Sequence, residues 1–475
     1  MPDYQAVRQS GWMFEIPRTA RADMRVPARI YADSALWDQI SQDQSIEQLV
    51  NVATLPGVTG YVYAMPDVHQ GYGFPVGGVA ATRVRDGVIS PGGVGYDINC
   101  GVRLLATELT VEDAGGRLET AVHQLSRSIP SGPGRNPRFS LDPAELDRVL
   151  TEGCRYLVER ELATPDDLAV TEATGCLAAA DSDAVSAKAK TRGHDQLGTI
   201  GSGNHFVEVQ QVDQVFDDAA AEAYGLTDGR LTVLIHTGSR GLGHQVCTDH
   251  VRLMDQVMER YGIHLPDRQL ASAPLDSPEG ARYFGAMCAA ANFAWANRQV
   301  ITHYVREVFA QVFGEAHRPR LVYDVAHNIA KLEVYDGEEL CVHRKGATRA
   351  FGPASPETPD RYRAHGQPVF IPGSMGTASY VLAGADTSGK RSFGSCCHGA
   401  GRAMSRGAAK RRVTGAQVRR ELESRGIVVR CASKSGLAEE APLAYKDVDR
   451  VVDVVHRAGL ARKVARLTPL GVIKG

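Results

Sequence analysis

The chain of 475 residues lacks the sequence signatures of several protein classes. No run approaches the roughly 18 apolar residues that a membrane-spanning helix needs. The nine cysteines are odd in number, include no CxxC pair and show no disulfide-like spacing, which favours a reducing compartment. Residues 1–32 also lack the apolar core of a signal peptide. We therefore expect a cytoplasmic protein with no membrane association.

An excess of charge of one sign is missing as well. The 53 Lys and Arg residues nearly balance the 55 Asp and Glu residues, which gives a formal net charge of −2. Because no global field would draw the protein to a polyanion, any site for nucleic acid must be local. Hydrophobic residues make up 43% of the chain, which is enough for a sizeable core and excludes a disordered protein.

Internal repeats and Pro/Ser-rich linkers are absent too. A prior of about 150 residues per domain would suggest about three domains. However, chemistry-bearing motifs run without interruption from Asp67 to Lys474, so we expect one catalytic domain over residues 1–475. We predict the α+β class, a mixed domain whose active site is built from glycine-rich turns at strand ends. Residues 110–190 show helical patterning without concentrated ligand types and are assigned to scaffold or periphery.

Two buried strands are predicted to end at histidines. Residues 231–235 (LTVLI) run into His236, which is followed by a glycine loop, and residues 320–325 (RLVYDV) run into Ala326 and His327. A short apolar run followed by glycine is typical of a strand that delivers a side chain to a site. Both histidines are therefore candidate functional residues.

Two helices accompany these strands in the prediction. Residues 245–261 and about 287–312 carry apolar side chains at helical spacing. In the second helix we expect these core residues: Trp295, Ile301, Tyr304, Val305, Val308 and Phe309.

Five residues have the side-chain chemistry of a transition-metal site. Asp97 and Cys100 form a D-x-x-C pair in a glycine-framed turn, His205 and His236 lie near glycine, and His327 stands in the run Ala326-His327-Asn328. Alone, each is better explained as a buried or turn residue, but together they suit Mn²⁺, Zn²⁺ or Co²⁺ better than Ca²⁺ or Mg²⁺. A shared thiolate and carboxylate could hold two metals about 3.5–4 Å apart, a spacing that clamps phosphoryl oxygens.

His398 is a candidate phosphorus nucleophile. It lies in the small-residue run SCCHGAGR, with Arg402 and Arg406 nearby to neutralise phosphate. Alone it would be interpreted as a turn histidine at a helix start, but the neighbouring arginine pair favours the nucleophile. The chain contains neither G-x-x-x-x-G-K-[ST] nor K-x-D-G, so a P-loop and the usual lysine nucleophile of nucleotidyl transfer are both missing.

Two further features are less specific. Residues 372–379 (PGSMGTAS) could grip a base or a phosphate with backbone N–H groups. Basic residues cluster at 343–349 and between 402 and 425, and they could follow a nucleic-acid backbone or simply form solvated helix faces.

Several long strings together closely resemble the RtcB family of RNA-splicing ligases. They are residues 65–74 (MPDVHQGYGF), 90–103 (SPGGVGYDINCGVR), 324–328 (DVAHN), 343–346 (HRKG) and 471–475 (GVIKG), in addition to the motifs above. The resemblance spans nearly the whole chain. It implies an RNA ligase that depends on Mn²⁺ and GTP and joins a 2′,3′-cyclic phosphate or 3′-phosphate end to a 5′-hydroxyl end. Such ends arise in tRNA splicing and in RNA damage, so tRNA halves or broken RNA are the implied partners.

The resemblance also implies roles for individual residues. Two Mn²⁺ ions would be held, one by Asp97, Cys100 and His205 and the other by Cys100, His236 and His327. His398 would attack the α-phosphorus of GTP to give a histidine–GMP intermediate with loss of pyrophosphate. The guanylate would then pass to the RNA 3′-phosphate, and the 5′-hydroxyl would displace GMP.

The implied GTP-binding residues form a longer set, of which Lys474 is the next-to-last residue of the sequence. They are Asn204, His205, Phe206, Val207, Glu208, His327, Asn328, Pro372, Gly373, Ser374, Met375, Ser379, His398, Gly399, Ala400, Gly401, Tyr445 and Lys474. Asp67 and Arg240 lie in matching strings, but the sequence gives neither a defined role.

Two rival functions stay open on the sequence. A dinuclear metal phosphohydrolase would use the same Asp/Cys/His cluster without a nucleotide, although it leaves His398 and Lys474 unexplained. A non-catalytic RNA-binding protein could keep the metal for stability. The sequence does not separate tRNA splicing from RNA repair or show whether an activating partner of the archease type is needed, and we expect a monomer.

Overall fold

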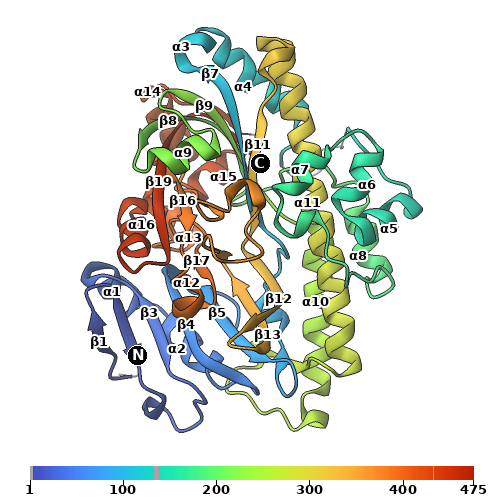
Figure 1. Ribbon diagram of the computed structural model, residues 1–475, viewed down its shortest axis with the longest axis vertical. Coiled ribbons are helices and arrows are strands. Elements are labelled where there is room, and N and C mark those ends of the chain that lie inside the picture. The colour runs from blue at the N-terminus through green and yellow to red at the C-terminus, as the bar shows by residue number, and fades with distance from the viewer. Residues whose placement is uncertain (1–3, 133–137, 432) are drawn as a thin grey trace.

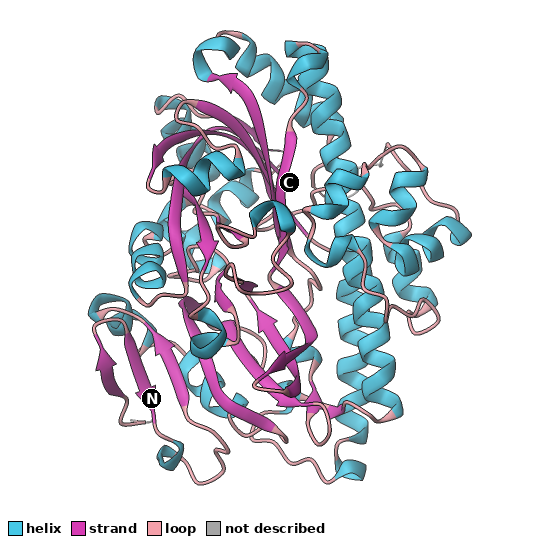
Figure 2. Ribbon diagram, viewed as in Figure 1, coloured by secondary structure: helices cyan, strands magenta, loops and turns pink. Residues whose placement is uncertain are grey.

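Two large β-sheets and a pair of long helices form the framework of the protein. The structure is a computed structural model that describes residues 4–132, 138–431 and 433–475. The sheets occupy one side of the molecule and the long helices run along the other (Figure 1, Figure 2). This confirms the predicted α+β class. None of the helices in the described ranges is both long enough and apolar enough to span a membrane.

The first sheet has seven strands and includes the N-terminal segment. It is antiparallel except between its third and fourth strands. Its spatial order is β1 (Val7–Ser10), β2 (Met13–Ile16), β3 (Ala28–Tyr31), β4 (Val58–His69), β5 (Val76–Arg83), β13 (Glu338–Lys345) and β12 (Asn328–Tyr335). Two short helices, α1 (Ser34–Ile40) and α2 (Ser45–Val52), lie in the connection between β3 and β4.

The second sheet has eight strands and includes the C-terminal segment. Its order is β11 (Arg320–Ala326), β7 (Gly101–Thr110), β9 (Arg230–Thr237), β8 (Phe206–Val215), β19 (Ala461–Lys474), β16 (Ser379–Gly384) and β15 (Pro368–Ile371), with β18 (Val428–Cys431) paired to β19. The two predicted strands at 231–235 and 320–325 are thus confirmed as parts of β9 and β11.

The register of the second sheet gathers distant segments at one edge. Ala326 pairs with Gly101, and Gly101 pairs with Thr237. His236 pairs with Phe206, which in turn pairs with Lys474. Five strand ends therefore meet in a row, and the residues just outside them are brought close together in space.

The two long helices are α10 (Arg240–Val257) and α11 (Pro278–Phe313), which pack against each other. The six predicted core residues of α11 are confirmed, since each is at most 4% exposed. The predicted start at 287 is wrong, because Ser277 accepts a hydrogen bond from the backbone N–H of Gly280 and starts the helix with Pro278 in its first turn. The predicted range 245–261 for α10 is also shifted, and a 3₁₀ turn (Glu259–Tyr261) follows that helix.

Shorter helices cover the periphery. The helical patterning of residues 110–190 is confirmed by a set that lines no part of the central cavity described below: α3 (Val111–Ala114), α4 (Arg117–Ser128), α5 (Pro143–Glu152), α6 (Cys154–Glu159), α7 (Pro165–Ala169) and α8 (Ala187–Gly193). The remaining helices are α9 (Asp218–Tyr224), α12 (Ser388–Ser392), α13 (Arg406–Arg412), α14 (Gly415–Ser424), α15 (Lys434–Glu439) and α16 (Val448–Arg457). Short strands β6 (Val88–Ile89) and β10 (Ala273–Pro274) pair with each other, as do β14 (Ala347–Arg349) and β17 (Ser395–Cys397).

The hydrophobic interior consists of a main core and a smaller cluster. The main core joins both sheets to α10 and α11. The smaller cluster, called here the satellite core, lies under α14, α15 and β18 and contains Met375, Val418, Leu422, Ile427, Val429, Leu437, Ala441 and Val472. The two cores support different parts of the candidate site.

Candidate active site

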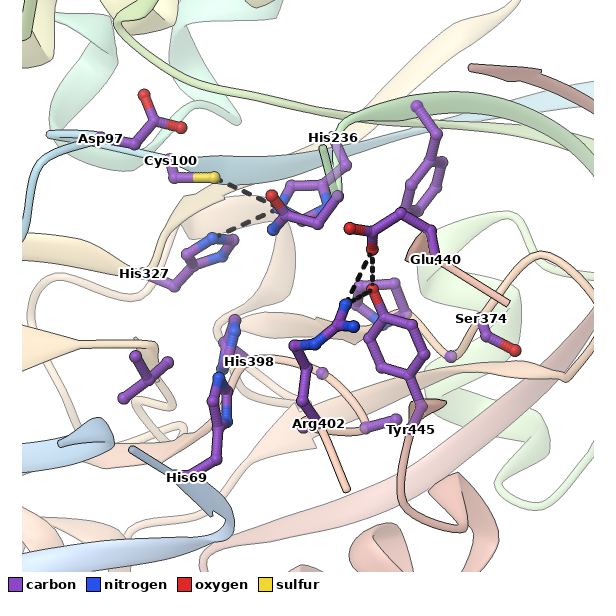
Figure 3. A pocket seen from close by; sticks show the side chains of 18 of the residues that line it. His69, Asp97, Cys100, His236, His327, Ser374, His398, Arg402, Glu440 and Tyr445 are labelled. Carbon is purple, nitrogen blue, oxygen red and sulfur yellow. Dashed lines mark hydrogen bonds and ion pairs between the residues drawn. The ribbon is translucent and has the colours of Figure 1, made fainter. Parts of the chain in front are cut away.

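A cavity of about 240 Å³ lies at the edge of the second sheet where the strand ends meet. Figure 3 shows side chains from several segments pointing into it. Of the predicted site residues, the cavity is lined by Asp97, Cys100, Asn204, Phe206, His236, His327, Asn328, Pro372, Gly373, Ser374, Met375, His398, Gly399, Ala400, Gly401, Tyr445 and Lys474. Motifs spread over most of the chain therefore enclose one space.

The first candidate metal set is Cys100, His236 and His327. The Cys100 Sγ lies 3.3 Å from His236 Nε2, which lies 3.4 Å from His327 Nε2. All three residues are buried, and one ligand atom from each lies within 4.8 Å of the others. Three donor atoms thus converge from the start of β7, the end of β9 and the residue after β11.

The second set is Asp97, Cys100 and His205, so Cys100 belongs to both. The Cys100 Sγ is 3.4 Å from His205 Nε2, and Asp97 Oδ2 is 2.8 Å from the same nitrogen. His205 Nδ1 is engaged by the carbonyl of Ile200 at 3.0 Å, which leaves Nε2 for the site. We call Asp97, Cys100, His205, His236 and His327 the metal end of the cavity.

Local backbone geometry explains how Asp97 and Cys100 reach the site. The backbone N–H of Cys100 donates to the carbonyl of Asp97 at 2.9 Å, and Asn99 has a φ of +50°. These features make a tight turn that turns both side chains toward the same space. Gly238 allows the close approach, because a Cβ there would lie 2.5 Å from the Asp97 carboxylate.

A buried ion pair fixes the strand ends that carry the metal end. Arg298 of α11 makes two 2.8 Å hydrogen bonds to Asp324 of β11, and both side chains are fully buried. The same guanidinium donates at 2.8 Å to the carbonyls of Asn99 and Thr237. One side chain therefore ties together the turn before β7, the end of β9 and β11. Arg103 of β7 adds a second bond to Asp324 at 2.6 Å.

The electrostatics of the metal end fit a transition metal. Burial lowers the pKa of His236 and of His327 well below the usual range, so both imidazoles are neutral and can donate an electron pair. Burial, and next the charge of Asp97, raise the pKa of the Cys100 thiol. Both oxygens of Asp97 are buried, and neither makes a hydrogen bond of good geometry within the described residues, although Oδ2 lies 2.8 Å from His205 Nε2. A bound cation would supply the missing partner and favour the thiolate.

His398 is held by Asp67 between the two ends of the cavity. Its Nδ1 lies 2.6 Å from Asp67 Oδ2, and the same oxygen accepts from the backbone N–H groups of His398 at 3.0 Å and Gly399 at 3.3 Å. Asp67 is fully buried near the end of β4. Its carboxylate fixes the imidazole so that Nδ1–H is the donor and Nε2 is left with a lone pair. The His398 ring centroid is 4.8 Å from that of His327.

Glycines make the turn that carries His398 possible. Gly401 has a φ of +74°, and a Cβ there would lie 2.1 Å from the carbonyl oxygen of Asp67. The turn can therefore lie directly on β4. The loop that begins at Pro372 follows β15 and is closed by the hydroxyl of Thr377, which accepts from the backbone N–H of Ser374 at 2.7 Å.

The far end of the cavity carries the other predicted nucleotide contacts. We call Ser374, Met375, Glu440, Tyr445 and Lys474 the nucleotide end. Met375 belongs to the satellite core. Lys474 is buried, lies 5.7 Å from the centre of the Phe206 ring, and has a pKa that is lowered by burial.

Four predicted nucleotide contacts lie beside the cavity lining instead of in it: His205, Val207, Glu208 and Ser379. Val207 is fully buried in the main core. Glu208 and Ser379 are bridged by Gln210, whose Nε2 is 2.8 Å from Glu208 Oε2 and 3.0 Å from Ser379 Oγ. Burial raises the pKa of Glu208 to about 8.

Sequence reasoning missed several lining residues. Glu440 lines the cavity but belongs to no recognisable motif, and Tyr96 and His69 line it from within the strings 90–103 and 65–74, although the sequence assigned neither of them a role. Lys345 also lines it; its Nζ donates to the carbonyls of Tyr72 and Phe74, and burial lowers its pKa to about 7.

For the basic run at 343–349, the sequence left open whether it follows a nucleic-acid backbone or forms a solvated helix face. It is buried, and Arg344 makes an internal ion pair with Glu333 at 2.6 Å. Neither interpretation fits this run, because Arg344 pairs with Glu333 inside the first sheet and Arg349 of β14 pairs with Glu172 and Glu357.

Arg240, which the sequence left without a role, starts α10 beside the metal end. Its φ is +57°, and its Nε donates to Thr199 Oγ1 at 3.2 Å. Its guanidinium lies against Gly201, where a Cβ would lie only 2.0 Å away. Burial lowers its pKa, against the opposing charges of Asp97 and Cys100.

Comparisons with known proteins agree with the geometry. A family model described as "tRNA-splicing ligase RtcB" matches residues 48–475. A "tRNA-splicing ligase RtcB" of Thermococcus kodakarensis is 55% identical over 469 residues, 97% of each chain, and one of Archaeoglobus fulgidus is 54% identical over 471 residues, 98% of each chain. An "RNA-splicing ligase RtcB" of Mycobacterium tuberculosis is 54% identical over 435 residues, which cover 90% of this chain and all of that protein.

Proposed function

The chain belongs to the RtcB family of tRNA-splicing ligases, and from this premise we propose that it joins two RNA ends. One end would carry a 2′,3′-cyclic phosphate or a 3′-phosphate, and the other a 5′-hydroxyl. GTP would activate the phosphate end. The observation that carries the proposal is the setting of His398, an imidazole that Asp67 holds at 2.6 Å between the metal end and the nucleotide end of one cavity.

The five residues of the metal end are proposed to hold two Mn²⁺ ions, with Cys100 shared between the sets. The donor set of thiolate, imidazole and carboxylate suits a transition metal. Bound there, the ions would neutralise charge on the phosphoryl groups. The chain's own part is to keep His236 and His327 neutral through burial and to hold the strand ends through Arg298.

His398 is proposed as the nucleophile. Because Asp67 holds Nδ1, the lone pair of Nε2 is free to attack the α-phosphorus of GTP, and the bond from that phosphorus to the bridging oxygen breaks as pyrophosphate leaves. The carboxylate of Asp67 stabilises the positive charge that develops on the ring. Arg402 and Arg406 line the same cavity and can bind phosphate oxygens.

Two further steps complete the proposed reaction. An oxygen of the RNA 3′-phosphate attacks the phosphorus of the histidine-bound GMP, and the bond to His398 breaks. The 5′-hydroxyl oxygen then attacks the RNA 3′-phosphorus, loses its proton and releases GMP, which leaves a 3′,5′-phosphodiester. A cyclic phosphate must first be opened by water.

The guanosine would occupy the nucleotide end. We propose the eighteen predicted residues as the surroundings of GTP, because fourteen of them line this cavity. Glu208 and Ser379 would act from beside the lining, through Gln210.

We further propose a cytoplasmic monomer with a single catalytic domain. The absence of a membrane-spanning helix among the described residues is compatible with this location. Size-exclusion chromatography with light scattering tests the monomer. Joining assays with and without a purified archease-type protein test the need for an activating partner.

The test of the function uses two RNA strands, one with a 3′-phosphate and one with a 5′-hydroxyl, in the presence of Mn²⁺. We expect joining only when GTP is added, and none with His398→Gln. The matched control is His264→Gln, because His264 is exposed and does not line the cavity. GTP-independent release of phosphate without joining would instead support the dinuclear phosphohydrolase.

A further inference from the structure

The carboxylate of Glu440 contacts two arginines and a tyrosine at the nucleotide end of the cavity. Glu440 is only 1% exposed. Its carboxylate lies 3.3 Å from Arg402 Nη1 and 3.1 Å from Arg406 Nε, and it accepts a hydrogen bond from the hydroxyl of Tyr445. Figure 3 shows Glu440, Arg402 and Tyr445 linked at the side of the cavity opposite Cys100.

We propose that Glu440 is the positioning residue of the nucleotide end. It fixes the ring of Tyr445 as a face for the guanine base, and it holds the guanidinium groups of Arg402 and Arg406 where the phosphates of GTP pass. The inference rests on the proposed function, since it assumes that GTP occupies this cavity.

The backbone brings Arg402 and Tyr445 together, and the Arg402 side chain also donates to the backbone carbonyls of Met404 at 3.1 Å and Glu439 at 2.8 Å. The two residues form an antiparallel bridge, and the N–H of Lys446 donates to the carbonyl of Gly401 at 2.9 Å. The Arg402 guanidinium carbon lies 5.1 Å from the centre of the Tyr445 ring. Long arginine side chains keep considerable rotamer freedom, so a backbone bridge alone does not order them. Glu440 completes that order, because its carboxylate contacts Arg402, Arg406 and Tyr445 together.

Glu440 is itself held firmly. It follows α15 directly, and its backbone N–H donates to the carbonyl of Gly436 at 3.2 Å. The next residue, Ala441, is buried in the satellite core. Arg402 Nη2 also donates at 2.8 Å to the backbone carbonyl of Glu439. The carboxylate therefore starts from a rigid segment, as a positioning role requires.

The charge balance supports the same role. Burial by itself would raise the pKa of Glu440, but the charge of Lys474, followed by Tyr445, Arg402 and Arg406, lowers it overall, so the group is ionised. One carboxylate thus faces three cations. Without it, the like charges of Arg402, Arg406 and Lys474 would repel one another and favour conformations that point away from the cavity.

The experiment compares three variants in the full chain with Mn²⁺ present. Glu440→Gln keeps the shape but removes the charge, Glu440→Asp keeps the charge, and Glu439→Gln is the matched control. Glu439 is the neighbouring residue, and its side chain pairs with Lys410 at 2.9 Å on the surface. The measured quantities are the KM for GTP and the maximal rate of guanylylation in single-turnover reactions, together with the thermal unfolding midpoint.

We expect Glu440→Gln to raise the KM for GTP about tenfold, because charge-assisted hydrogen bonds to two arginines are lost. The maximal rate should change less than the KM, Glu440→Asp should recover part of the loss, and Glu439→Gln should match the wild type. Tyr445→Phe should raise the KM as well, and the double variant should show less than the sum of the two effects in free energy, because both changes break the same contact.

Two results would overturn the inference. The first is an unchanged or lower KM for GTP in Glu440→Gln. The second is a loss of maximal rate and thermal stability with no change in KM, which would show a purely structural residue. A wild-type protein that takes up no guanylate from GTP would instead overturn the proposed function, so the two failures are distinguishable.

Discussion

The metal end and the nucleotide end of the cavity are built in different ways. The metal end stands on the main core, where Arg298 and Asp324 form a fully buried ion pair beneath neutral histidines. The nucleotide end stands partly on the smaller satellite core, and its charges lie in the cavity itself. At the metal end, the ion pair that fixes the side chains lies beneath the cavity. At the nucleotide end, the ion pairs lie between residues of the cavity lining itself. Changes at the metal end should reduce stability and metal binding together, whereas changes at the nucleotide end should act mainly on GTP.

The largest expected effect comes from Asp324→Asn beneath the metal end. It leaves Arg103 and Arg298 without their buried anion, and breaking one side of a buried pair costs about 3–5 kcal/mol. We expect this loss in the free energy of unfolding, measured by urea denaturation, together with weaker Mn²⁺ binding measured by calorimetry.

The matched control is Asp360→Asn, because the Asp360 side chain is 98% exposed in its pair with Arg363. Exposed pairs contribute roughly 0–1 kcal/mol. Equal losses for the two variants would contradict the account of the metal end.

Asp67→Asn tests the residue that links the two ends through His398. An asparagine can still bond to the ring but favours the wrong tautomer and no longer stabilises an imidazolium. We expect guanylylation to slow by roughly 10²–10⁴-fold, with Mn²⁺ binding unchanged. Single-turnover labelling with GTP measures the rate. A parallel loss of Mn²⁺ affinity would show that Asp67 acts on the metal end instead.

Glu208→Gln tests whether burial beside the nucleotide end raises the pKa of the Glu208 carboxyl. The folded-state pKa of Glu208 is about 8, above its usual value of 4.5, so the folded state binds the extra proton. Stability from this group is therefore present below pH 4.5 and is lost as the pH rises toward 8.

Glutamine removes that dependence, and relative to the wild type the variant should gain about 3–4 kcal/mol in the free energy of unfolding between pH 5 and pH 8, at ~1.4 kcal/mol per pKa unit. Urea denaturation across this range measures the difference. A constant difference between the two proteins at all pH values would contradict the assigned pKa.

Of these variants, Lys474→Met should have the smallest effect, and it should change the affinity for GTP alone. It removes a buried cation near Phe206 but leaves the metal end untouched. We expect GTP affinity to fall about tenfold and Mn²⁺ affinity to stay constant, both measured by calorimetry. A fall in Mn²⁺ affinity of the same size would contradict the claim that the metal end and the nucleotide end act on different ligands.

The sequence predicts the candidate metal ligands and the candidate nucleophile better than it predicts the residues that hold them in place. The five metal-end residues and His398 stand in recognisable strings, most of them near glycine, and β9 and β11 have the short apolar runs of buried strands. Arg298 and Glu440 have no such signal, because their role depends on contacts with residues far away in the chain.

Boundaries were harder to predict than element types. The start of α11 was missed because Gly280, Gly285 and several alanines weaken the apolar pattern, although Ser277 and Pro278 form a recognisable N-cap. Strand order could not be read at all, since it depends on pairings such as Lys474 with Phe206 across most of the chain.

The most direct test of the account is to locate the covalent guanylate. The protein is incubated with Mn²⁺ and GTP, digested under conditions that preserve phosphoramidates, and analysed by tandem mass spectrometry. The account predicts GMP on His398, in the peptide that follows β17, and no adduct in His398→Gln. GMP on another residue, such as Lys345, or no adduct in a preparation that still joins RNA with GTP, would contradict it.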